Sequence, residues 1–234
     1  MLAIFKREFK SYFTSMTGYA FAAFLLIFTG IYTMSICLMG YYSNFEYVVG
    51  NVAFIFLIIV PVLTMRVFAE ERKQKTDQLL YALPLSMTKI VLGKYLALLA
   101  IFAVPVAVMA VYPFILSFFG NVSIKISFCA IFGFFLLGAA LIAIGMFISS
   151  LTESQPLAAA ICFLVLLVNY LADGLSAYVP FGAQLLSDTC LFMRLDQFVY
   201  GVLDLSVVAL FVSVAAVAVF LTVQALEKRR WSHG

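Results

Sequence analysis

The stretch VFAEERKQKTDQLLYALPLSMTKIVLGK, residues 67–94, places two acids and then a series of bases in a chain that is 65% hydrophobic. Only 11% of the 234 residues are charged, whereas soluble domains carry about 25%. Such a chain cannot present a hydrated surface on every side. Outward from this stretch, the sequence consists mainly of runs without Asp, Glu, Lys or Arg: 11–45, 47–65, 95–124, 126–152, 154–172 and 205–226.

Each charge-free run is long enough, or nearly so, to cross a membrane, because a hydrocarbon core about 30 Å thick takes roughly 20 helical residues. The apolar residues are continuous and do not alternate with a period of two, which favours helices over a β-barrel. The sequence therefore predicts an all-α polytopic membrane protein with a single domain, 1–234. We expect six transmembrane helices, at 17–40, 50–68, 92–117, 127–150, 155–172 and 204–225, with a short outer loop at 41–50 and a kink at Pro61.

The positive charges give the orientation of these helices. When successive loops are placed on alternate sides of the membrane, all but Lys125 and Arg194 of the 14 lysines and arginines fall on one side. The positive-inside rule then puts both termini and residues 67–94 in the cytoplasm. The net charge of +3 reflects basic residues that face anionic membrane lipid, so we expect no nucleic-acid partner.

Residues 1–14 predict an amphipathic helix that lies along the inner membrane interface. Apolar side chains share one helical face and bases lie elsewhere, with only Ile4 departing from the pattern. The apolar face is Leu2, Phe5, Phe9, Tyr12 and Phe13, and the bases are Lys6, Arg7 and Lys10. The candidate interfacial residues are Phe5, Lys6, Arg7, Phe9 and Lys10.

Between the second and third spans, residues 70–83 have the pattern of an amphipathic helix that continues from the membrane into water and stops at Pro84. Arg72 and Lys73 are expected on its solvated side. Ser86 is expected to cap a second short helix that leads into the third span. The apolar positions of these two helices must be buried against the lipid headgroups or against a protein partner, and the residues alone leave both alternatives open.

The same segment resembles the region after the second helix of ABC-2 type exporter permeases, particularly those of gliding-motility and related bacterial ABC systems. That family has an E-E pair, often a Gly-Thr, Leu-rich turns, a Pro and an I-V-x-G-K sequence that opens the third helix. The matching residues are Glu70, Glu71, Thr76, Leu79, Leu80, Pro84, Ile90, Val91, Gly93 and Lys94. Lys75 stands where the family commonly has Gly. GMFISSLTESQPLAAA, residues 145–160, is similar to the family's link between helices 4 and 5.

The resemblance implies a transmembrane permease subunit in a bacterial plasma (inner) membrane, with residues 70–90 as the coupling region for a separate ATPase. The coupling residues it implies are Glu70, Glu71, Arg72, Lys73, Thr76, Leu79, Leu80, Pro84, Ser86 and Met87. No G-x-x-x-x-G-K-[ST] sequence is present, and Gly93–Lys94 lacks the upstream glycine, so ATP and Mg²⁺ would bind two ATPase copies and not this chain. Because six helices make half of a typical exporter pathway, we also expect a second permease subunit, as a homodimer or a related heterodimer.

Two other classes of function remain as alternatives. Glu70 and Glu71 invite comparison with the E-E-x-x-x-R motif of CAAX-type membrane proteases, but residue 75 is Lys and the single histidine is His233. A catalytic metal site takes clustered His, Cys or carboxylate ligands, and the four cysteines are scattered, which favours packing, although a disulfide on the outer side is possible. The second alternative is a channel or scaffold without ATP coupling, and only the family resemblance argues against it.

The sequence indicates only the broad chemical class of the cargo. Ionisable residues within the membrane normally mark ion or proton pathways, and the middles of these spans lack them, which favours a lipid-like, amphipathic or peptide cargo. Asn169 and Tyr170 are the candidate pathway residues, with interfacial anchoring as the alternative. For residues 173–203 we expect short helices; the resemblance implies a partly re-entrant outer element, and a helix lying on the surface is the alternative.

Overall fold

The described part of the chain is a bundle of helices. The computed structural model describes residues 2–40, 44–73, 86–176 and 190–232, and no strand occurs in these residues. Six candidate spans confirm the predicted all-α polytopic membrane protein. They are Met16–Met39, Phe45–Arg72, Met87–Leu116, Ile124–Leu151, Gln155–Ala172 and Leu205–Arg229.

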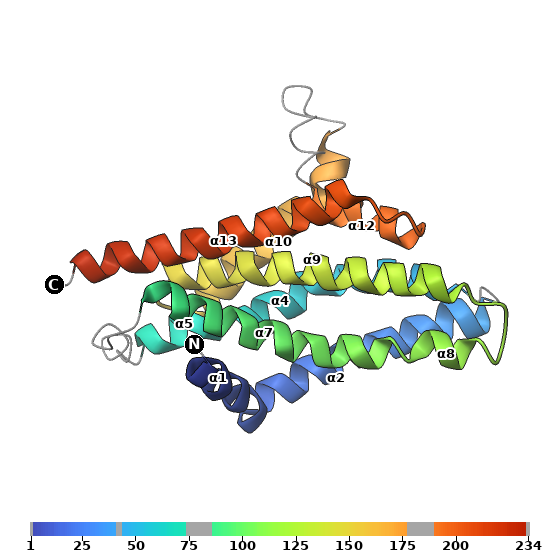
Figure 1. Cartoon of the computed structure of the whole chain (residues 1–234), viewed down its shortest axis with the longest axis horizontal. Helices are drawn as coiled ribbons and strands as arrows, with labels where there is room; N and C mark the ends of the chain where they lie inside the picture. Colours follow the sequence, from blue (N-terminus) through green and yellow to red (C-terminus); the bar gives the residue numbers. More distant parts are fainter. Residues whose placement is uncertain (1, 41–43, 74–85, 177–189, 233–234) are drawn as a thin grey trace.

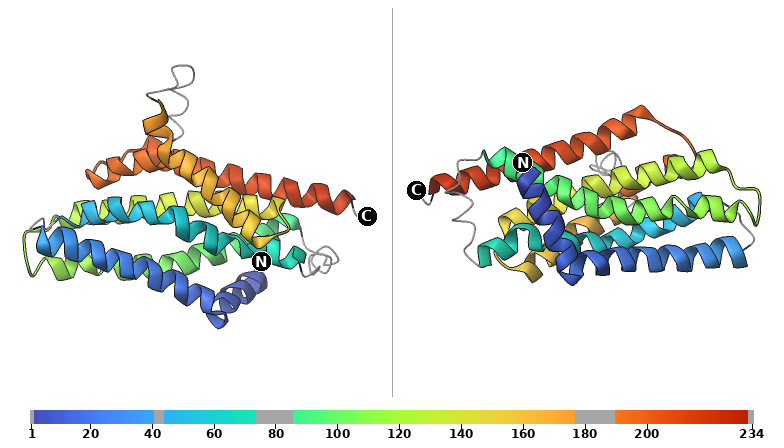
Figure 2. Two further views of the ribbon diagram at one scale, coloured as in Figure 1. Left: turned by 180° about the vertical axis from the view of Figure 1, so that it is seen from behind. Right: turned by 60° about the horizontal axis from the view of Figure 1, so that its bottom comes forward.

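The helices run mostly along the long axis of the bundle, while the N-terminal helix crosses them obliquely (Figures 1 and 2). In chain order they are α1 (Leu2–Thr14), α2 (Met16–Thr33) with a π-helical end (Met34–Met39), α3 (Phe45–Val52), a 3₁₀ turn (Ala53–Ile55), α4 (Phe56–Thr64), α5 (Arg66–Lys73), α7 (Met87–Met109), α8 (Tyr112–Leu116), α9 (Ile124–Leu151), α10 (Gln155–Ser176), α12 (Leu191–Val199) and α13 (Leu205–Ser232). The N-terminus, the end of α5, the start of α7 and the end of α13 lie at the same end of the bundle (Figure 1).

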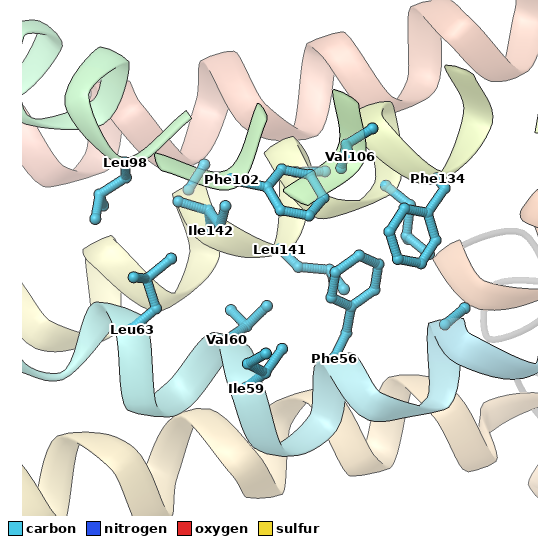
Figure 3. Packing of buried hydrophobic residues seen from close by; sticks show 14 of the residues in the cluster. Phe56, Ile59, Val60, Leu63, Leu98, Phe102, Val106, Phe134, Leu141 and Ile142 are labelled. Carbon is cyan, nitrogen blue, oxygen red and sulfur yellow. The ribbon is translucent and has the colours of Figure 1, made fainter. Parts of the chain in front are cut away.

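Helix α9 is the centre of the fold and packs against α4, α7, α10, α12 and α13. Phe56 of α4, Phe102 of α7 and Phe134 of α9 meet in a fully buried aromatic cluster, with ring centroids 4.5–6.0 Å apart (Figure 3). The Phe102 ring lies where a Cβ on Gly138 would stand. Small residues therefore let neighbouring helices approach α9 closely, as is common where helices pack in membranes.

The second span is longer and less regular than predicted. It begins at Phe45, so the expected outer loop 41–50 is wrong for 45–50, and it is divided by the 3₁₀ turn and by a break at Met65. Pro61 lies inside α4, and the Met65 N–H donates to the Pro61 carbonyl at 2.9 Å. Glu46, which broke the charge-free run in the sequence, is only 4% exposed within α3.

Other boundaries differ for local reasons. The third span begins at Met87, directly after Ser86 at the N-cap, and the Ser86 side chain makes no capping bond. Its regular helix ends at Met109 and resumes at Tyr112, because Pro113 has no N–H to donate to the Met109 carbonyl and its ring clashes with that carbonyl in a continuous helix. The last helix continues beyond the predicted 225 to Ser232, since Lys and Arg side chains favour a helix C-terminus.

Candidate functional site

A buried lysine lies at the end of the bundle where α5 ends and α7 begins. Lys94, in the second turn of α7, is only 2% exposed. Its Nζ lies 2.7 Å from Oε1 of Glu71 on α5, donates to the Val67 carbonyl at 2.8 Å, and stands 4.8 Å from the centre of the Phe68 ring. A buried charge requires a partner and saturated hydrogen bonding. Lys94 thereby ties the start of α7 to α5.

The N-terminal helix adds two further charges to this contact. Glu8 of α1 lies 3.7 Å from Lys94 Nζ, and Arg7 contacts both Glu8 at 2.7 Å and Glu71 at 3.3 Å. We call Arg7, Glu8, Glu71 and Lys94 the inner charge cluster. The hydrogen bond to Glu8, together with the negative charges of both acids, raises the pKa of Arg7. With two acids and two bases, the cluster is neutral as a set.

A second group of contacts holds α1 and α2 against the end of α4. Tyr12 of α1 is buried and donates from its hydroxyl to the Leu63 carbonyl at 3.1 Å. Burial raises the pKa of this hydroxyl, so it stays a donor at neutral pH. Arg66 pairs with Glu70 one turn along α5, at 2.7 Å, and reaches Thr17 of α2 at 3.3 Å.

Helices α5 and α9 cap each other. Because α5 starts anew after Met65, its first N–H groups lack partners within the helix, and the N–H groups of Phe68 and Ala69 donate to Ser149 Oγ of α9 at 3.2 and 3.3 Å. In return, Arg72 of α5 donates to two carbonyls at the end of α9, those of Ser150 and Thr152.

These contacts make α5 a mechanical junction. It is bonded to α7 through Lys94, to α1 through the inner charge cluster and to α9 through Ser149 and Arg72. A displacement applied to the start of α7 or the end of α5 must therefore move α1 with it or break buried polar contacts, each of which costs about 1–3 kcal/mol when a group is left unsatisfied.

The predicted coupling residues divide into three groups. Thr76, Leu79, Leu80 and Pro84 lie outside the described residues. Glu71, Arg72 and Met87 face inward, with Met87 only 3% exposed, and the expectation that Arg72 is solvated is wrong because it caps α9. Glu70 is partly exposed and paired, Ser86 is exposed, and Lys73 ends α5.

The N-terminal helix packs on the bundle through a row of residues that the sequence pattern did not single out. Ile4, which departed from the sequence pattern, is 8% exposed, and with Glu8 and Tyr12 it forms the inward row at a spacing of four. The predicted interfacial residues form the flanks: Phe5 and Phe9 are half-buried with ring centroids 5.9 Å apart. The bases Lys6, Arg7 and Lys10 are exposed.

At the opposite end of the bundle, the two candidate pathway residues lie in different settings. Asn169 accepts the Leu191 N–H on its side chain at 3.1 Å and the Cys190 thiol on its carbonyl at 3.2 Å, so it holds the start of α12. Tyr170 is 39% exposed, makes edge contacts with Phe54 and Phe192, and lines a pocket with Asp196 of α12. The re-entrant course of 173–203 stays a prediction, since 177–189 lie outside the described residues.

Three important charges were missed by the reading of the sequence. Glu8 was hidden among the bases of α1, and Lys94 was noticed only as part of a family pattern. Glu46 accepts a hydrogen bond from Ser127 at 3.3 Å and is buried between α3 and α9. The signal that could have identified Glu8 is its spacing of four from both Ile4 and Tyr12.

The described residues contain no group of three His, Cys, Asp or Glu side chains placed to hold a metal ion. The four cysteines are free and buried, as expected of small packing residues.

A known protein family matches most of the chain. The family model described as ABC-2 family transporter protein matches residues 2–191. No curated protein matches the chain. The matched range includes α1, all four residues of the inner charge cluster and the first residue of α12.

Proposed function

The chain belongs to the ABC-2 transporter family, and from this premise we propose that it is a permease subunit whose inner charge cluster receives the motion of a separate ATPase. The observation that carries the proposal is the family match over 2–191 together with the junction at α5, which bonds to α1, α7 and α9. The gliding-motility type of the system stays a prediction.

In this proposal the ATPase docks on the link between α5 and α7, and the docked surface includes Glu70 and Ser86. Glu71 and Arg72 have a different role, because both are engaged inside the bundle. They position α5 and transmit its displacement, and they do not contact the ATPase. Two ATPase copies and two permease subunits would complete the transporter, with ATP and Mg²⁺ on the ATPase.

The orientation and cargo belong to the same proposal. The basic residues at the end of the bundle that carries both termini support a cytoplasmic location for that end in a bacterial plasma membrane. The outer pocket beside Tyr170 combines aromatic rings with a mainly polar exposed lining that includes Asp196, which supports an amphipathic or peptide cargo. A lipid-like cargo and the direction of export stay predictions from the sequence.

Purification in mild detergent with site-specific photocrosslinkers tests the docking surface. Ser86 and Ser123 are both exposed N-cap residues, of α7 and α9, at opposite ends of the bundle. A crosslinker at Ser86 is expected to capture a copurifying ABC ATPase, and one at Ser123 is not. A complex with no ATPase, or equal capture from both positions, would reject the proposal in favour of a channel or scaffold.

A further inference from the structure

An apolar groove opens on the surface of the bundle between α7, α9 and α13. Its volume is about 260 Å³, and its lining includes Leu92, Tyr95, Leu136, Ala139, Val212 and Ala216. The Tyr95 hydroxyl donates to the Ala139 carbonyl at 3.1 Å, so the main polar group in the wall is already satisfied. This volume is slightly below the roughly 300 Å³ at which pockets for whole small molecules begin. The groove therefore suits one slender apolar segment.

Basic side chains stand where the groove approaches the end of the bundle that carries both termini. Lys89 is exposed and precedes Leu92 by three residues, so it continues the groove-lining face of α7 by one turn. Arg229 lies one turn beyond Leu226, which follows the groove-lining Val219 by two turns of α13. It uses one N–H on the Leu151 carbonyl at 3.0 Å, and a guanidinium has five.

A second apolar groove serves as an internal comparison. It lies between α2 and α4, is lined by Thr17, Phe21, Ile58 and Leu63, and has a volume of about 190 Å³. The cation at its inner end, Arg66, already pairs with Glu70 at 2.7 Å. Lys89 forms no such ion pair with a carboxylate in the described parts of the chain. Apolar lining and an available positive charge therefore coincide at the α7–α9–α13 groove.

We propose that the α7–α9–α13 groove binds one acyl chain of an anionic phospholipid of the inner leaflet, whose headgroup phosphate lies on Lys89 and Arg229. The groove is apolar along its length and so contacts the acyl chain, and the basic side chains Lys89 and Arg229 supply the charge that selects an anionic headgroup. This inference does not depend on ATP coupling, because it concerns only this chain and the lipid around it.

Photolabelling locates the lipid. The full chain is reconstituted in nanodiscs that contain phosphatidylglycerol with a photoactivatable group in the middle of one acyl chain. Labelled peptides are expected from α9 and α13 around Leu136 and Val212. Label confined to the α2–α4 groove, or uniform label over all spans, overturns the proposal. Crosslinking of two copies of the chain through a cysteine placed at Ala216 also overturns it, since the groove would then hold a second subunit.

Matched variants test the two parts of the site separately, with native mass spectrometry of retained phosphatidylglycerol against phosphatidylcholine as the readout. Lys89→Gln is expected to lower the preference for the anionic lipid about fivefold, which corresponds to ~1 kcal/mol per basic residue near an anionic surface. Lys125→Gln, an exposed lysine at the opposite end, is the control. An equal effect of both substitutions would mean that only bulk charge is sensed, and would refute the site.

The groove itself is tested by Ala216→Phe, which fills it, against Val217→Phe on the neighbouring face of α13, where Val217 is 56% exposed. Ala216→Phe should remove the retained lipid of both headgroup types, while Val217→Phe should leave it unchanged. Retention of lipid by the filled variant would show that the acyl chain lies elsewhere.

Discussion

The inner charge cluster makes a specific prediction about stability, tested by Glu71→Gln, Lys94→Met and the two changes together. In Glu71→Gln, the Lys94 ammonium stays 98–99% enclosed without its anionic partner at 2.7 Å, and Glu8 at 3.7 Å is too distant for a hydrogen bond. Removing one member of a buried ion pair costs about 3–5 kcal/mol. Because the amide can still accept one hydrogen bond and Glu8 still attracts, we expect a value of about 3 kcal/mol, near the lower limit.

Lys94→Met should cost less, about 1–2 kcal/mol, because it removes the buried charge and loses mainly hydrogen bonds. The remaining Glu71 is 18% exposed and keeps Arg7 at 3.3 Å, so it is not left isolated. In the double variant both charges are gone and the cluster is again neutral. Replacing a buried ion pair by apolar groups is often neutral. The second change is therefore expected to restore stability that the first removed.

The four buried free cysteines provide the assay, because a thiol-reactive fluorogenic dye reports their exposure during thermal unfolding. For a chain of this size about 1 kcal/mol corresponds to a shift of roughly 2–4 °C in Tm, so Glu71→Gln should lower Tm by roughly 6–12 °C. Glu153→Gln, at an exposed acid in the turn after α9, is the control and should change little. A double variant no more stable than Glu71→Gln would refute the reasoning.

Three smaller changes test other contacts. Gly138→Ala should destabilise the bundle by about 1–3 kcal/mol, because Phe102 must move out of the space that the new methyl group occupies. Gly30→Ala is the control in the same thermal assay, because its new methyl group would lie 3.8 Å from the Tyr112 hydroxyl and displace nothing. Tyr12→Phe should cost about 1 kcal/mol through loss of one buried hydrogen bond to α4, and an unchanged Tm would show that the bond contributes nothing. Hydrogen bonds from the Ser206 backbone N–H and hydroxyl lower the pKa of Asp204. The ionised Asp204 side chain therefore stabilises the start of α13 fully at a pH above its ordinary pKa of 3.8, and this stabilisation should be lost as the pH falls through the lowered pKa. Amide hydrogen exchange of the first turn, corrected for intrinsic rates, should rise there in the native chain and not in Asp204→Ala.

The spans could be predicted from the sequence because a single property, absence of charge over about 20 residues, determines them. Their ends could not, since they depend on particular contacts. Glu46 carries a charge and so appeared to end a membrane run, yet α3 buries it at 4% exposure beside Ser127. The length of the last helix was underestimated for the same reason, because charged residues near a helix end were taken as its limit.

The inner charge cluster was beyond sequence reasoning for a different reason. Glu71 and Lys94 are separated by 22 residues, and Glu8 lies on a third helix, so no local period connects them. Arg72 was assigned to the solvated side by the general rule that charged residues face water. The rule fails because the end of α9 presents carbonyls without partners, and a guanidinium from α5 satisfies them.

The distribution of polar contacts has a mechanical consequence for the proposed coupling. The middle of the bundle is held by apolar packing around Phe56, Phe102 and Phe134, which is not directional and permits small sliding of one helix past another. The end of the bundle that carries α5 and the inner charge cluster is held by hydrogen bonds and ion pairs, which are directional and short. Under a force applied near Ser86, α1, α5 and the first turns of α7 should therefore move as one body, and α5 holds α9 through the polar contacts of Ser149 and Arg72. The α5–α9 contact is thus one place where motion from the ATPase would either pass to the centre of the bundle or stop.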